Sequence, residues 1–153
     1  MYARILVPVD GSATAECGLR EAMAWAAQVR AELVLLRVLD DDPVTIERAP
    51  ARYAEEVREA ARRLGQTLVA GYVGLAHESG VRARGIVRDG LARGVADVIL
   101  EEAKAQDCQL IVMGTHGRRG FERIALGSDA EAVARRAPVP LLLVRHPGAS
   151  HSG

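Results

Sequence analysis

A glycine-rich segment in the last third of the chain has the residue types that bind phosphate. It begins Gly114-Thr115-His116-Gly117, continues through Arg118 and Arg119, and closes with Gly127-Ser128. Glycine lets backbone N–H groups approach phosphate oxygens and permits the positive φ angles of an anion nest. A helix that begins after Gly127 would add N–H groups without intrahelical acceptors and the positive end of a dipole. The segment therefore predicts a polyphosphate site.

The polar side chains of this segment each have two interpretations. Arg118 and Arg119 can make strong, directional contacts with phosphate, His116 less readily, or all three belong to a solvated loop. Ser128 can contact phosphate, but Ser128-Asp129-Ala130-Glu131 is also a capping box, in which the hydroxyl and the Glu131 carboxylate cap backbone donors. The two roles of Ser128 are compatible, and both remain open from the sequence.

The elements that position this segment follow from the hydrophobic pattern. Five short apolar runs alternate with stretches of helical period, which is typical of a parallel sheet covered by helices on both faces. Most of the runs lack polar alternation, as expected for strands that are buried on both sides. The glycine segment follows the fourth run and so lies at the carboxyl edge of the sheet, where open α/β folds bind ligands. We expect strands at residues 4–9, 32–39, 81–87, 109–113 and 141–145.

Four helices are expected between these strands. The first carries apolar residues at three- and four-residue steps around Leu19 and Ala26. The third runs from about 91 to 106, and the fourth begins at Ser128 and ends before Pro138. The second helix has glycines that weaken a helix interior, which predicts fraying or a break after Leu68. Its expected core-facing stripe is Tyr53, Val57, Ala60, Leu64, Leu68, Tyr72 and Leu75.

Composition excludes several classes of protein. The 153 residues include 20 basic and 20 acidic side chains, so the chain lacks the positive field of a nucleic-acid-binding protein. Its aliphatic runs are too short to span a membrane, and the N-terminus has no secretory pattern, so a cytoplasmic location is expected. Cys17 and Cys108 are too few for a disulfide framework or a zinc pattern. Residues 40–42 are three aspartates that form a turn cluster rather than a metal site.

The spacing Gly-x2-Gly-x9-Gly-Ser from Gly114 to Ser128 resembles the ATP-binding signature of the universal stress protein family. Residues 5–12, Ile-Leu-Val-Pro-Val-Asp-Gly-Ser, look like the first strand and turn of that family, and the resemblance extends to about Arg145. It implies a single-domain, doubly wound, Rossmann-like sheet of five parallel strands in the order 3-2-1-4-5, of the adenine nucleotide alpha hydrolase-like type. The implied domain spans residues 1–146, and residues 147–153 form a flexible tail.

The resemblance also implies a ligand and its contacts. The ligand is ATP, with or without Mg²⁺, and the adenosine part binds near Asp10 and the backbone at Val38. From the residues alone, Asp10 equally suits a cap for the helix that begins near Ser12. The family commonly dimerises through its last strand, here residues 141–145. The residues expected to bind the nucleotide are Pro8, Val9, Asp10, Val38, Met113, Gly114, His116, Gly117, Arg118, Arg119, Gly127, Ser128 and Asp129.

Asp129 departs from the family pattern, which most often has valine and then a hydroxyl residue after the Gly-Ser pair. A carboxylate in a first helical turn is favoured by the dipole, yet it repels phosphate by roughly a few kcal/mol if both are desolvated. It can instead face solvent or help to hold Mg²⁺. This departure puts the affinity for phosphate in doubt rather than the place of the site.

No catalytic constellation is visible in the sequence. No Ser or Cys has a readable pairing with a His and a carboxylate, and only Asp129 and His116 are near enough to serve ATP hydrolysis. We therefore expect a stress-response protein that binds an adenine nucleotide and whose occupancy changes a loop or a dimer surface. The alternatives are a nucleotide-free member of the family that acts through protein contacts, and a slow ATPase or phosphotransferase.

Overall fold

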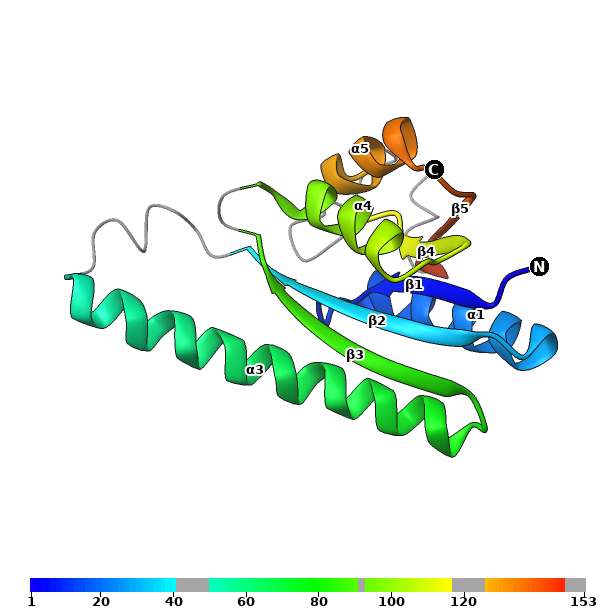
Figure 1. Ribbon diagram of the computed structural model, residues 1–153, viewed down its shortest axis with the longest axis horizontal. Helices are drawn as coiled ribbons and strands as arrows, with labels where there is room; N and C mark the ends of the chain where they lie inside the picture. The colour runs from blue at the N-terminus through cyan, green and yellow to red at the C-terminus, as the bar shows by residue number, and fades with distance from the viewer. Residues whose placement is uncertain (41–49, 91–92, 117–125, 148–153) are drawn as a thin grey trace.

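The computed structural model describes residues 1–40, 50–90, 93–116 and 126–147. Within them the chain forms one parallel sheet in the order β3-β2-β1-β4-β5 (Figure 1), which confirms the predicted order. The strand bounds agree with the predicted runs to within two residues. The strands are β1 (Arg4–Pro8), β2 (Glu32–Leu39), β3 (Arg82–Asp89), β4 (Leu110–Gly114) and β5 (Leu141–Val144).

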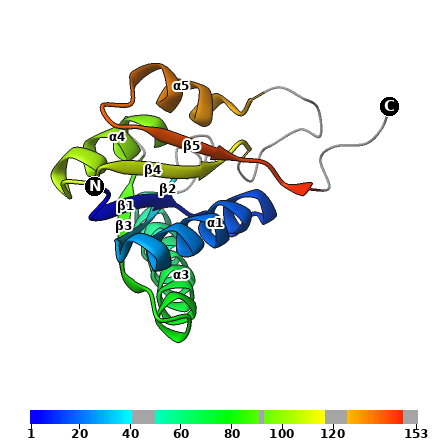
Figure 2. The same ribbon diagram turned by 90° about the vertical axis from the view of Figure 1, so that its right-hand side faces the viewer.

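Helices cover both faces of the sheet, so the fold is doubly wound as predicted. α1 (Ala13–Val29) and α3 (Ala51–Glu78) lie on one face, and α4 (Val95–Ala105) and α5 (Ser128–Arg136) lie on the other (Figure 2). Two buried clusters fill the spaces between the layers. Successive residues of β1 serve opposite clusters: Ile5 packs toward α1 and α3, whereas Leu6 packs toward α4. This two-sided burial explains the unbroken apolar runs.

The second helix of the sequence analysis, α3, is one continuous helix of 28 residues, so the expected break after Leu68 is wrong. Among the α3 glycines, Gly65 has a packing role, whereas a Cβ at Gly71 or Gly74 would meet no heavy atom within 4 Å. A Cβ placed at Gly65 would lie 3.2 Å from Leu39 Cδ2 and 3.3 Å from Arg37 Cγ. Gly65 therefore lets the helix approach β2 closely, and tertiary packing outweighs its low helix propensity.

The expected core-facing stripe of α3 is also wrong. Five of its seven members are exposed, and the residues that face the sheet are offset from them around the helix. The first turns of α3 project beyond the strands in Figure 1, so no sheet surface lies beneath them to cover. Over the sheet, small residues let the helix pack closely. The exposed members are Tyr53, Val57, Ala60, Leu64 and Leu75, and the buried positions of α3 are Ala54, Gly65, Val69 and Ala76.

The remaining helices follow the predictions except at one start. α4 begins at Val95 rather than near 91, because Gly94 adopts a φ of 85° that ends the preceding turn. Cys17 and Cys108 are free thiols, the second buried, and burial raises the pKa of Cys108 to about 11. Among the described helices, none has the length and apolar content that a membrane span requires.

Candidate functional site

The turn after β1 presents a carboxylate at the carboxyl edge of the sheet. The Asp10 Oδ1 atom accepts a hydrogen bond from the Ser12 backbone N–H at 2.9 Å, and the Ser12 hydroxyl accepts one from Ala15 N–H at 3.2 Å. Gly11 joins them with a φ of 81°, which favours glycine. The capping interpretation of Asp10 is therefore wrong as stated, because the N-cap of α1 is Ser12. The Asp10 carboxylate instead closes the turn that leads into this cap.

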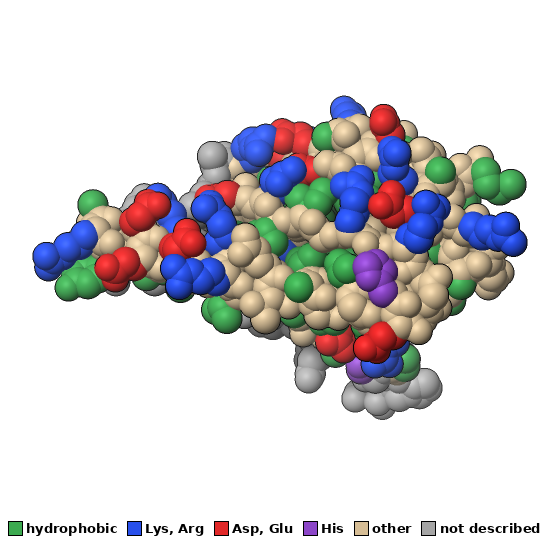
Figure 3. All heavy atoms as spheres, turned by 60° about the horizontal axis from the view of Figure 1, so that its bottom comes forward, with side chains coloured by type: hydrophobic (Ala, Val, Ile, Leu, Met, Phe, Trp, Pro, Cys, Tyr) green, Lys and Arg blue, Asp and Glu red, His purple; other side chains and the backbone are tan. Residues whose placement is uncertain are grey.

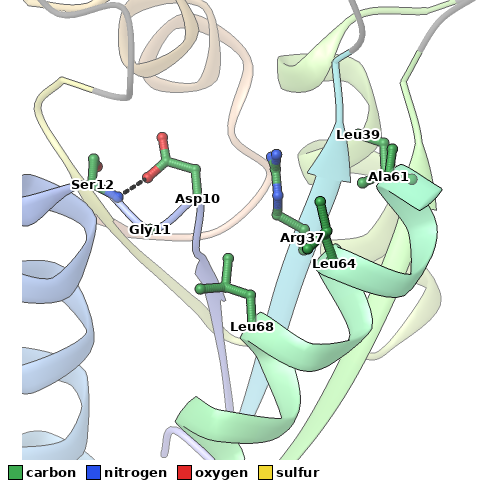
Figure 4. Close-up of a pocket in the computed structure, with 9 residues that line it drawn as sticks. Asp10, Gly11, Ser12, Arg37, Leu39, Ala61, Leu64 and Leu68 are labelled. Carbon is green, nitrogen blue, oxygen red and sulfur yellow. Dashed lines mark hydrogen bonds between the residues drawn. The ribbon is translucent and has the colours of Figure 1, made fainter. Parts of the chain in front are cut away.

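A cavity of about 640 Å³ opens beside this turn, within the size range of small-molecule sites. It lies between the ends of β1 and β2 and the middle of α3 (Figure 4). The side chain of Asp10, in the turn after β1, extends in the same direction as that of Arg37 on β2, while Leu64 and Leu68 approach from α3. The cavity therefore combines apolar walls with one anionic and one cationic group. Its lining is Asp10, Gly11, Ser12, Arg37, Leu39, Ala61, Leu64, Gly65 and Leu68.

Arg37 is the cation of this cavity, and its side chain is only 12% exposed. Its Nη1 atom donates a hydrogen bond to the Val38 carbonyl oxygen and lies 3.8 Å from Asp40 Oδ1. The family resemblance assigns the Val38 backbone to adenosine. A carbonyl oxygen has two lone pairs, so the Arg37 contact leaves one acceptor position at Val38. A ligand here meets a guanidinium as well as the backbone.

Two glycines of the predicted phosphate-binding motif, Gly114 and Gly127, make close contacts within the fold. A Cβ at Gly114 would lie 2.7 Å from Thr14 Cγ2 and 2.8 Å from the Thr14 carbonyl oxygen. The Gly127 N–H donates to the Thr115 carbonyl oxygen at 2.8 Å, so this amide is already satisfied. Two of the three motif glycines therefore have a packing reason in addition to the predicted ligand contact.

The capping box predicted at the start of α5 does not form. The N-cap of α5 is Gly127, which makes no side-chain cap, and Ser128 is the first helical residue. Glu131 pairs instead with Arg135, with 2.7 Å between Arg135 Nη2 and Glu131 Oε1. Glycine fits this N-cap because a Cβ would lie 2.9 Å from Thr115 O. The structural interpretation of Ser128 is thus wrong, and its hydroxyl is exposed at the helix N-terminus.

The other predicted site residues are only partly brought together. Pro8 and His116 are half-buried, and Ser128 and Asp129 are exposed. Among the predicted residues that the structure describes, only Asp10 lines the cavity. Gly114 is buried at the end of β4, and the three buried apolar side chains of the set belong to the cores on either side of the sheet: Val9, Val38 and Met113. Three predicted residues lie outside the described part of the chain: Gly117, Arg118 and Arg119.

Sequence reasoning missed Arg37 of β2 and the whole contribution of α3. Arg37 carried a usable signal, because it interrupts an otherwise apolar run near the end of a buried strand. Ala61 and Leu64 carried none, since their place beside Asp10 depends on where α3 crosses the sheet.

A hydrogen bond ties α3 to α1 near the cavity. The Tyr72 hydroxyl donates to Glu16 Oε1 at 2.8 Å. Burial, the hydrogen bond to Glu16, and the negative charges of Glu16 and Asp10 together raise the pKa of Tyr72 to about 12. This contact fixes α3 against α1, and hence the wall formed by Leu68 against the turn at Gly11.

The described residues contain no group of three or more His, Cys, Asp or Glu side chains placed to hold a metal ion. Of the aspartate turn cluster, Asp40 is near Arg37, and residues 41 and 42 lie outside the described part of the chain.

Comparisons with known proteins agree on one family. A sequence model of the universal stress protein family matches residues 1–145. Universal stress protein MJ0531 of Methanocaldococcus jannaschii is 33% identical over 147 residues, which cover 96% of this chain and 84% of that protein.

Solved structures share the whole fold. The hypothetical protein MJ0577 superposes with a TM-score of 0.83 at 26% identity, covering 95% of this chain and 97% of that one. A universal stress protein from Archaeoglobus fulgidus, solved in complex with dAMP, superposes with a TM-score of 0.63 at 25% identity, covering 94% and 98%.

Proposed function

Because the chain belongs to the universal stress protein family, we propose that it binds an adenine nucleotide, with ATP as the ligand and the cavity beside Asp10 as the adenosine site. The observation that carries the proposal is the cavity itself, which opens at the carboxyl edge of the sheet. The dAMP complex of the Archaeoglobus fulgidus relative supports the ligand class.

The cavity suits a nucleoside chemically. Leu39, Leu64 and Leu68 offer apolar walls for a flat base. The Asp10 carboxylate can accept hydrogen bonds from ribose hydroxyls, and the Arg37 guanidinium can donate to ring nitrogens or to oxygen acceptors. The volume of about 640 Å³ leaves room for the adenine base and the ribose ring.

The start of α5 suits the phosphates. Because Ser128 does not cap the helix, its hydroxyl is exposed beside the first-turn amides of Ser128 and Ala130, which have no intrahelical acceptors. The positive end of the helix dipole adds attraction for an anion. Asp129 is exposed, so water screens its repulsion of phosphate to about 1 kcal/mol at 4 Å. Mg²⁺, when bound with ATP, would neutralise phosphate charge, and the Asp129 carboxylate is of the type that this ion prefers.

The edge strand β5 supports a homodimer. β5 pairs only with β4 in the described sheet, and all four of its residues are apolar and half-buried. An unpaired edge can be satisfied by the same strand of a second subunit. Occupancy of the nucleotide site would then act on a loop or on this dimer surface, in a cytoplasmic protein that responds to stress. The nucleotide-free alternative predicts the same dimer without ligand binding.

Calorimetric titration and thermal melts test the proposal. We expect Mg-ATP to bind and to raise the melting temperature, by the equivalent of about 2.7 kcal/mol at one hundred times the dissociation constant. ADP and AMP, tested beside it, separate the contribution of the phosphates. If none of the three nucleotides at millimolar concentration gives a heat of binding or a shift in melting temperature, the proposal is refuted and the nucleotide-free alternative is favoured.

Asp10→Asn tests the predicted place of the ribose. The asparagine oxygen can still accept from Ser12 N–H, so the turn and the melting temperature of the protein alone should hold. A hydrogen bond to a charged group is worth about 1.5–3 kcal/mol, so affinity should fall by roughly ten- to a hundredfold. Asp107→Asn makes the same chemical change at an exposed left-handed position and should leave affinity unchanged. Equal affinities for the two variants would place the ribose elsewhere.

A further inference from the structure

The projecting end of α3 exposes a row of apolar side chains that none of the described residues bury. We call Tyr53, Val57, Ala60 and Leu64 the α3 row. Tyr53 is 47% exposed, Val57 45% and Leu64 72%. Figure 3 shows hydrophobic, basic and acidic side chains intermixed on this projecting end, at the left. Exposed apolar side chains gathered on one face of a helix mark an interaction surface.

The spacing of the row is that of a two-helix seam. Its members are separated by four, three and four residues, which is the a/d pattern of helices that pack side by side. Arg52 lies over the Tyr53 ring, with 4.8 Å between the guanidinium carbon and the ring centroid, and holds this aromatic at the surface. The row therefore fits another helix rather than a flat surface.

The charges that flank the row are complementary to those of a second, antiparallel copy of the same helix. Glu56 and Arg63 stand seven residues apart and so lie along the same edge of the row. If two copies of α3 pack antiparallel about a two-fold axis midway between residues 53 and 64, Glu56 of each copy lies beside the partner's Arg63. The same symmetry sets Tyr53 against the partner's Leu64, and Val57 against the partner's Ala60. Every member of the row meets an apolar partner, and two ion pairs close one edge.

We propose that the α3 row is a contact surface for a second copy of this chain, packed antiparallel through the projecting ends of the two helices. It is distinct from the contact proposed at β5 and does not rest on nucleotide binding. The overlap from Tyr53 to Leu64 is about 16 Å long, so the contact belongs to the small, reversible class. Leu64 also lines the cavity, which brings the partner's Tyr53 to the wall of the proposed adenosine site.

Charge argues for a protein partner over a lipid surface. The α3 segment from residue 51 to residue 64 carries four arginines and three glutamates, a net charge of 4 − 3 = +1. Anionic membranes recruit clusters of four to eight basic residues without balancing acids. A second copy of the chain instead uses both signs of charge.

Charge reversal with rescue tests the contact. Sedimentation velocity at low salt, over a wide range of protein concentration, should show reversible association of the wild type. Glu56→Arg and Arg63→Glu should each weaken it by about tenfold, because two attractive pairs become repulsive. The double variant E56R/R63E should restore it. Glu55→Arg makes the same charge change away from the row and serves as the matched control.

The rescue separates the contact from effects on the helix itself. Arg63 is paired with Glu59 at 3.6 Å within α3, and this pair is lost in both variants that change Arg63. A loss of association that came from helix damage would therefore persist in the double variant. Val57→Gln, at an exposed position outside the cavity, should abolish the association while the melting temperature holds.

Several outcomes would overturn the proposal. A wild-type mass that does not depend on concentration would do so, and so would single reversals that associate like the wild type or a double variant that fails to recover. Flotation with phosphatidylserine vesicles tests whether the α3 row binds a lipid surface. Binding to these vesicles that Val57→Gln removes would assign the α3 row to a lipid surface instead.

Discussion

Gly114→Ala tests whether the glycine motif is also a packing motif. The added Cβ would lie 2.7 Å from Thr14 Cγ2, 2.8 Å from Thr14 O and 2.9 Å from Thr14 C. Carbon atoms pack at about 3.5 Å or more, so the first turn of α1 must move away from β4 by about 1 Å. A change of rotamer cannot relieve the clash, because two of the three atoms are backbone. Overpacking of this kind costs about 1–3 kcal/mol of unfolding free energy.

Gly71→Ala is the matched control, with the opposite expected sign. A Cβ at Gly71 has no heavy atom within 4 Å, and alanine is favoured over glycine inside a helix by about 1 kcal/mol. Urea denaturation at 25 °C should show a lower midpoint for Gly114→Ala and a higher one for Gly71→Ala. Nucleotide affinity should fall only in Gly114→Ala, because the turn at Asp10 leads directly into the displaced helix. A Gly114→Ala stability within about 0.5 kcal/mol of the wild type would refute the packing argument.

Two other perturbations follow from the structure. Folding raises the pKa of Tyr72 from 10.0 to about 12, so this contribution to stability is present below pH 10 and is lost as the pH rises toward 12. Between pH 9 and 11 the melting temperature of the wild type should therefore fall more steeply than that of Tyr72→Phe. Equal slopes for the two proteins would contradict a raised pKa of Tyr72 in the folded state. At β5, Leu143→Pro should give a smaller mass in light scattering than Leu143→Ala. The carbonyl oxygens of Pro140 and Val144 accept hydrogen bonds from β4 and its end. By the alternation along a parallel strand, the amide of Leu143 points to the free edge, so proline at this position blocks pairing with a partner strand without removing a hydrogen bond to β4. Equal masses would place the dimer contact elsewhere.

Much of the fold could be predicted because the three central strands, β1, β2 and β4, are buried on both sides. β2 was predicted with its observed bounds, since a strand between two helical layers must be apolar at almost every position. Pro138 likewise predicts where α5 ends, and the helix stops at Arg136. These features depend on local composition and on stiff residues, both of which a sequence displays directly.

The orientation of α3 could not be predicted in the same way. Its large apolar residues suggested a core-facing stripe, yet Leu64 is 72% exposed while Gly65 is buried. Small residues set the distance between helix and sheet, and a helix that packs closely leaves its larger neighbours at the side. The exposed face of such a helix resembles a core face in sequence. Only the position of α3 relative to the sheet separates the two, and that position also creates the cavity.

The glycine motif illustrates the limit of motif reasoning at the site. Gly114 allows the approach of Thr14, and Gly127 allows the approach of Thr115, so both glycines are needed by the fold whether or not phosphate binds. A substitution at either position would change stability and affinity together and could not separate the two roles. Asp10→Asn keeps the turn while changing the charge that faces the cavity. For this fold, conservative changes of polar side chains therefore test the nucleotide site more sharply than changes of the glycines that define its signature.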